Sequence, residues 1–198
     1  MTDYSEQKRN PWVRAILLGA WGLFIVATTA GLYRYQFTAG ASSTERSSDW
    51  PAQSRLQLSD HNRQLFVFLH PKCVCSNASI DELVRLQRKT RIRPTIVMWV
   101  PSTSNLEWRE TALVERLKNE LDATILFDVG GIECKLFGVE TSGHTMIFNS
   151  KGHRYFDGGL TRGRGHTGAN EYSQSALMVI NNEIDDSVHT PVFGCTLN

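Results

Sequence analysis

Two cysteines stand one residue apart in the middle of the chain, where an apolar stretch ends and a helical pattern begins. Residues 65–70, LFVFLH, predict a buried strand, and residues 77–89 carry apolar side chains at helical spacing. Cys73 and Cys75 lie between the two. Open α/β sheets place their sites at the carboxyl ends of strands, and the free N–H groups of a helix start stabilise an anion. We therefore expect one of these thiols to have a lowered pKa and to act as a nucleophile or a metal ligand.

The other two of the four cysteines differ in their surroundings. Cys134 falls within a short helical pattern among apolar neighbours, so we expect it to be a buried, inert side chain. Cys195 lies in the apolar segment TPVFGCTLN, which can pack back over the sheet and bring this thiol to Cys73 or Cys75. A disulfide between Cys73 and Cys75 themselves would close a strained ring, which makes such a bond easy to reduce.

The remaining pattern alternates strands and helices. Further strands are predicted over 94–101, 123–128, 145–149 and 154–159, and further helices over 104–121, 130–138 and 170–184. Strands that alternate with helices pair in parallel within a three-layer α/β domain, and the last two strands add an antiparallel hairpin. Ser79 and Glu82 have the spacing of a capping box for the first helix.

The first third of the chain has a different character. Residues 15–33 carry no charge and are long enough to cross a bilayer, and slightly more basic residues precede this run than follow it. We divide the chain into a short cytoplasmic N-terminus (1–14), a transmembrane helix (15–35), a linker rich in Ser, Thr, Ala and Gly (36–60) and a domain (61–198). A cleaved signal peptide is the alternative, and both interpretations place the domain outside the cytoplasm.

Composition narrows the possible functions. The net charge is +1 with acidic and basic residues interspersed, so the chain has no basic stripe of the kind that binds nucleic acid. An apolar content of 41% is enough for a packed core.

The stretch FVFLHPKCVCS, together with the predicted element order over 65–184, resembles the thioredoxin superfamily. The resemblance implies a thioredoxin-like three-layer sandwich with a mixed, mostly parallel sheet, here with one N-terminal transmembrane helix. In that family the first cysteine of a C-x-x-C pair attacks and the second resolves. Cys73 matches the first, Ser76 stands where the second would be, and Cys75 comes one place early. In TSGHT, His144 stands where the family has a cis-proline, so the resemblance implies an imidazole facing the cysteines.

A narrower resemblance is to the RedB type of membrane-anchored, thioredoxin-like bacterial proteins. The segments that carry it are HPKCVCS, TSGHT, GGLTRGRGHTGAN and PVFGC. The third segment contains Arg162, Arg164 and His166 and is only weakly similar to a phosphate-binding loop. We expect it to form a rim loop that touches a partner protein, or an ordered network of turns.

These observations favour a single-pass protein of the cytoplasmic membrane whose periplasmic or otherwise extracytoplasmic domain is a thiol–disulfide oxidoreductase. Its catalytic residues would be Cys73, Cys75 and His144, with Cys195 as a possible resolving or structural cysteine. Its partners would be thiols or disulfides of proteins outside the cytoplasm, and no cofactor is required.

Two alternatives remain open. Cys73 and Cys75 with either His144 or His166 could hold Cu(I) in a carrier or assembly factor, because soft thiolates and imidazole suit that ion. The domain could also have lost redox chemistry and serve as an interaction scaffold.

Overall fold

The computed structural model describes residues 10–41, 50–59, 63–103 and 106–197. The chain forms two compact units, residues 1–36 and 37–198. Parts of the predicted cytoplasmic N-terminus (1–9) and of the predicted linker (42–49 and 60) lie outside the described residues.

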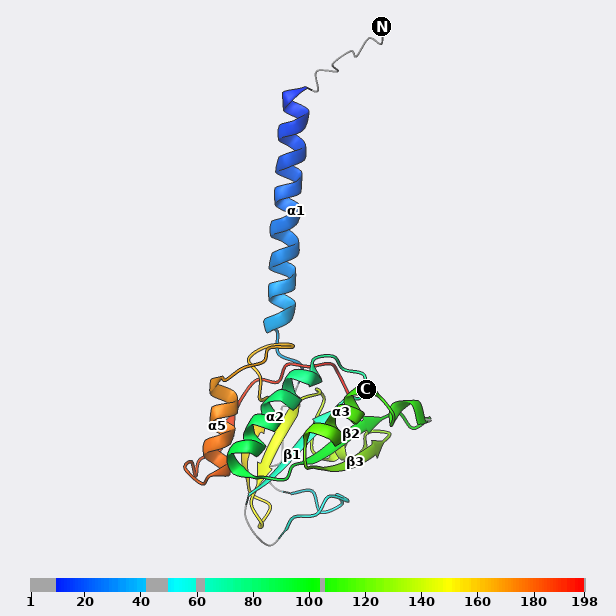
Figure 1. The fold of residues 1–198 in the computed structure, drawn as a ribbon, viewed down its shortest axis with the longest axis vertical. Helices are drawn as coiled ribbons and strands as arrows, with labels where there is room; N and C mark the ends of the chain where they lie inside the picture. Colours follow the sequence, from blue (N-terminus) through cyan, green and yellow to red (C-terminus); the bar gives the residue numbers. More distant parts are fainter. Residues whose placement is uncertain (1–9, 42–49, 60–62, 104–105, 198) are drawn as a thin grey trace. The chain divides into compact units, whose positions relative to one another are not determined.

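Helix α1, Pro11–Phe37, dominates the first unit (Figure 1). Asn10 begins it by accepting a hydrogen bond from the Trp12 N–H on its side-chain oxygen (3.2 Å), and Pro11 occupies the first helical turn, where a missing N–H costs nothing. Apolar side chains are exposed on every side of this helix, and Thr28 satisfies its hydroxyl internally on the Phe24 carbonyl. Among the described residues, α1 is the one helix long and apolar enough to cross a membrane.

The second unit is built on a six-stranded mixed sheet in the order β3-β2-β1-β4-β5-β6. Strands β1 to β3 are mutually parallel, β4 pairs antiparallel with both β1 and β5, and β6 pairs in parallel with β5. The strands are β1 (Gln64–Leu69), β2 (Thr95–Val100), β3 (Thr124–Val129), β4 (His144–Phe148), β5 (Arg154–Gly158) and β6 (Val188–His189). The helices are α2 (Ser76–Thr90), α3 (Ala112–Glu120), α4 (Ile132–Leu136) and α5 (Glu171–Ile180), with a 3-10 turn at Leu106–Trp108.

Alternation along β1 divides the core between the two faces of the sheet. Leu65, Val67 and Leu69 pack with α2, α3 and α5, which lie side by side over one face (Figure 1). Phe66 and Phe68 point to the other face. The predicted thioredoxin-like α/β fold class is thereby confirmed: three layers, with a mixed and mostly parallel sheet in the middle.

The layer over the second face is only partly helical. It contains α4 together with Trp50, Leu56 and Leu197, which come from residues before and after the α/β pattern. The centroid of the Trp50 ring lies 5.0–5.1 Å from the ring centroids of Phe66, Phe137 and Phe148. The packed unit therefore includes residues of the segment 36–60 that the sequence presents as a linker.

Some local predictions need correction. The helix expected over 104–121 is a 3-10 turn at Leu106–Trp108 followed by α3, which begins at Ala112. The helix after Cys75 begins at Ser76, three residues before the expected cap, so Ser79 and Glu82 lie inside α2 and form no capping box. The buried Glu82 carboxylate instead pairs with Arg85 and accepts a hydrogen bond from the Gly168 N–H (3.0 Å), which ties the Gly-rich loop to α2. Strand β6 has no counterpart in the predicted elements because two residues are too few to show a period.

Candidate functional site

Three thiols lie close together at the connection between β1 and α2. The sulfur atoms of Cys73, Cys75 and Cys195 all lie within 4.8 Å of one another, and the Cys73 and Cys195 sulfurs are 2.9 Å apart. Cys73 precedes the first turn of α2, where the Ser76 N–H donates to the Cys73 carbonyl (3.1 Å). The side chain of Cys73 is 2% exposed, whereas those of Cys75 and Cys195 are half-buried.

Cys73 is the thiol with the lowered pKa. Burial alone would raise this pKa, but hydrogen bonds from the Cys195 thiol and the Ser76 hydroxyl, and from the backbone N–H groups of both residues, lower it below the ordinary value. This combination stabilises a thiolate at the position where sequence reasoning placed the nucleophile.

The other two thiols are held in their neutral forms. Burial, a hydrogen bond to Cys73 and the negative charge on Cys73 raise the pKa of Cys195 to about 12. Burial and the charge on Cys73 also raise the pKa of Cys75. The guanidinium of Arg164 opposes both shifts, because a nearby positive charge favours a thiolate.

A short antiparallel pairing brings Cys195 to the site. The Ser142 N–H donates to the Cys195 carbonyl (2.8 Å), the Leu197 N–H donates to the Glu140 carbonyl (2.9 Å), and Thr141 faces Thr196. Gly194 allows this approach, because a Cβ built there would lie 1.9 Å from the Ser142 carbonyl oxygen. Arg164 holds the same segment by donating to the Gly194 carbonyl.

Two serines link this pairing to the start of α2. The hydroxyl of Ser142 accepts from the His70 N–H (2.8 Å) and lies 2.9 Å from that of Ser76. Ser76 thus connects Cys73 to the loop before β4. We did not predict a site role for Ser142, and neither composition nor periodicity distinguishes it from any other loop serine.

His144 pairs with Asp157 on the neighbouring strand. Its Nε2 is 2.5 Å from Oδ1 of Asp157, and both side chains are fully buried between β4 and β5. In the part of the chain that the structure describes, neither His144 nor His166 belongs to the cluster of thiols. The copper donor set expected from the sequence, two thiols and one of these imidazoles, is therefore not assembled, and Cys195 occupies the third position instead.

Cys134 is buried as expected, at 2% exposure. Burial, with the negative charge of Asp128 nearby, raises the pKa of this thiol far above the ordinary value. Its N–H donates to the Asp128 carboxylate at the start of α4 (3.0 Å), so this residue has a structural role.

Aromatic side chains flank the site at the ends of β1 and β2. His70 stacks on Trp99 with ring centroids 5.3 Å apart, and Trp108 meets both rings edge-on. Burial and the neighbouring charge of Lys72 lower the pKa of His70. Between the two cysteines of the C-x-C pair, Val74 is 82% exposed, so an apolar side chain faces solvent next to Cys73.

Comparison with solved structures gives likeness of fold. A hypothetical protein from Sinorhizobium meliloti aligns with a TM-score of 0.60 at 12% identity, covering 81% of this chain and 97% of that one. An uncharacterized conserved protein from Geobacillus kaustophilus aligns with a TM-score of 0.58 at 15% identity, covering 82% and 92%. A secreted Mycobacterium tuberculosis disulfide oxidoreductase homologous to E. coli DsbE aligns with a TM-score of 0.41 at 14% identity, covering 60% and 81%. No family model and no curated protein sequence matches the chain.

Proposed function

We propose that this protein is a thiol–disulfide oxidoreductase in which Cys73 attacks and Cys195 resolves. The observation that carries the proposal is the contact of 2.9 Å between these sulfurs at the start of α2, where hydrogen bonds lower the pKa of Cys73. In the reducing direction, the Cys73 thiolate attacks one sulfur of a substrate disulfide, and the other leaves as a thiolate that takes up a proton. Cys195 then attacks the Cys73 sulfur, a Cys73–Cys195 disulfide forms, and the second substrate thiolate leaves.

The charges at the site favour this order of events. Burial raises the pKa of Cys195 most, and the hydrogen bond to Cys73 and the negative charge of Cys73 raise it further. Once Cys73 is bonded to a substrate sulfur it carries no charge, so the last two causes vanish while Arg164 remains beside Cys195. The pKa of the resolving thiol therefore falls after the first attack, which favours its thiolate at that stage. This assignment replaces the C-x-C pair of the sequence-based hypothesis with Cys73 and Cys195, and it leaves Cys75 as a neighbouring thiol.

Helix α1 supports a membrane anchor. A single-pass protein with its domain outside the cytoplasm would meet the disulfides of secreted proteins, which persist there. The RedB type remains the narrower group to which we assign the chain by resemblance.

The pH dependence of Cys73 reactivity tests the nucleophile. We expect its alkylation by iodoacetamide, followed in the full chain in detergent micelles, to reach half its maximal rate below the ordinary thiol pKa. The direction follows from the thiolate being the reactive form, so a lowered pKa moves the rate profile to lower pH. Cys195→Ala removes a hydrogen-bond donor and should move the profile to higher pH. A profile centred at or above the ordinary thiol pKa, unchanged by Cys195→Ala, would contradict the proposal.

A second candidate function is Cu(I) binding, favoured by the cluster of three thiols within 4.8 Å. Thiolates are the soft ligands that Cu(I) prefers, so Cys73, Cys75 and Cys195 together would hold the ion and keep it in the reduced state.

Competition with a Cu(I) chelator tests this second candidate. We expect the reduced full chain to take up one equivalent of Cu(I), and Cys195→Ser to lower its affinity more than ~10-fold, about 1.4 kcal/mol. Cys134→Ser is the matched control, because that thiol lies outside the cluster. Equal affinity of the Cys195 and Cys134 variants would exclude a three-thiol copper site.

A further inference from the structure

Residues 194–197 cover the sulfur that a substrate must reach. Cys73 is 2% exposed, and its sulfur contacts Cys195, which belongs to this segment. In this arrangement the substrate disulfide has no approach to Cys73, so the segment must move before a reaction can begin. This argument rests on the proposed function of Cys73.

Residues 194–197 are bound to the rest of the domain in the way that a separate peptide would be. The segment lies antiparallel to residues 140–142 through two backbone hydrogen bonds, from Ser142 to Cys195 and from Leu197 to Glu140. Adding an extended strand to an exposed backbone edge is a common way for a protein to bind a polypeptide, because the backbone bonds form whatever the sequence.

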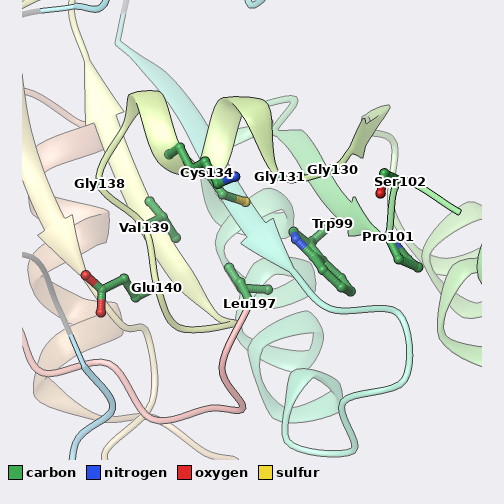
Figure 2. Close-up of a pocket in the computed structure, with 11 residues that line it drawn as sticks. Trp99, Pro101, Ser102, Gly130, Gly131, Cys134, Gly138, Val139, Glu140 and Leu197 are labelled. Atoms are coloured by element: carbon green, nitrogen blue, oxygen red, sulfur yellow. The ribbon is translucent and has the colours of Figure 1, made fainter. Parts of the chain in front are cut away.

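Side chains of the segment occupy two distinct positions. The thiol of Cys195 lies against the nucleophile, and two residues further on Leu197 is buried in the lining of a cavity of about 660 Å³. Figure 2 shows the Leu197 side chain between those of Val139 and Trp99. The two positions are spaced i, i+2, as side chains on one face of an extended strand are.

The geometry points to residues 194–197 as an internal substitute for the substrate: an extended polypeptide with the sequence Cys-x-apolar binds along 140–142 in their place. Its cysteine would take the position of Cys195 against Cys73, and its apolar side chain that of Leu197 in the cavity. Because this strip cannot hold both, substrate binding requires the segment to leave.

The return of the segment then has two consequences. Cys195 attacks the Cys73–substrate disulfide, so that a Cys73–Cys195 bond forms and the substrate sulfur leaves with the electron pair and takes up a proton. The same return displaces the substrate backbone from 140–142. Resolution and product release are therefore one event.

Peptide probes test the recognition. In the full chain in detergent micelles with Cys195→Ser, so that no resolution occurs, we would measure the rate at which Cys73 forms a mixed disulfide with thionitrobenzoate-activated Gly-Cys-Thr-Leu and Gly-Cys-Thr-Asp. We expect the leucine peptide to react about tenfold faster, since its side chain leaves water for the cavity. Equal rates would overturn the inference while leaving Cys73 a nucleophile. Failure of Cys73 to react with either peptide would overturn the proposed function.

Variants of the segment test its competition with substrate. In the same background, Gly194→Ala should raise the rate with both peptides several-fold, because the added methyl group clashes with the Ser142 carbonyl and moves the segment off the strip. Leu197→Asp should act in the same direction by removing the apolar contact, and near-UV circular dichroism would verify that each variant is folded. Thr196→Ala is the matched control, because that side chain is exposed. Rates unchanged by both Gly194→Ala and Leu197→Asp would show that the segment does not compete with substrate.

Discussion

Cys195→Ser is expected to stop the reaction halfway. With the reduced full chain in detergent micelles, a peptide disulfide in excess and no other thiol present, Cys73 should still attack and release one half of the substrate. Release of the second half should slow by ~100-fold or more, because a thiol held beside the target sulfur acts at an effective concentration that no dilute external thiol reaches. The Cys73–substrate disulfide should then accumulate to one equivalent and be visible by mass spectrometry.

The matched variant is Cys75→Ser, since the two thiols compete for the resolving role. Both sulfurs lie within 4.8 Å of that of Cys73, and the Cys195 sulfur is 2.9 Å from it. We expect Cys75→Ser to release both halves of the substrate. The reverse outcome, with trapping in Cys75→Ser and full release in Cys195→Ser, would restore the C-x-C pair as the redox couple. Cys73→Ser should release neither half.

The sequence was sufficient to predict the fold and the place of Cys73 within it. Apolar runs such as that of 65–70 and the helical spacing after Ser76 gave the element order, because each pattern is local and strong. The same local reasoning placed Cys73 at a strand end before a helix, which is where the structure has it.

The partner of Cys73 could not be fixed in this way. Cys195 stands 122 residues from Cys73, and its position depends on two backbone hydrogen bonds and on a glycine that admits a close approach. A contact of this kind produces no periodic pattern in the sequence. Arg164 is a similar case: its loop was expected at the rim of the site, but its effect on the thiols follows only from the packing.

His144 makes a contact that its place in the sequence does not predict. Its place in the chain, opposite Phe68 in the neighbouring strand β1, fits the expected position before a Thr. The direction of its ring, however, is set by a partner on the next strand, Asp157, that no motif identifies. Measurements on variants can decide whether His144 changes the pKa of Cys73 or only stabilises the sheet.

Asp157→Asn should destabilise the domain strongly and leave Cys73 chemistry unchanged. Asp157 is 1% exposed, with Oδ1 at 2.5 Å from His144 and Oδ2 at 3.3 Å from the Arg154 guanidinium. Removing its charge weakens the contacts of this buried carboxylate with both His144 and Arg154, and breaking a buried pair costs about 3 kcal/mol or more. We expect His144→Ala to act in the same direction, and His153→Ala, at an exposed position of the same hairpin, to have no effect.

Urea denaturation followed by near-UV circular dichroism measures the first part of this prediction. A loss of 3 kcal/mol lowers the midpoint by more than ~1 M for a domain of this size. The pH profile of Cys73 alkylation, taken well below the transition, measures the second part, because a merely stabilising histidine cannot move it. Since the cluster around Cys73 contains Cys75 and Cys195 but no imidazole among the described residues, the profile of His144→Ala should coincide with that of the parent protein. A displaced profile would instead mean that the imidazole acts on the thiolate, and His144 would regain the tuning role that its place in the sequence implies.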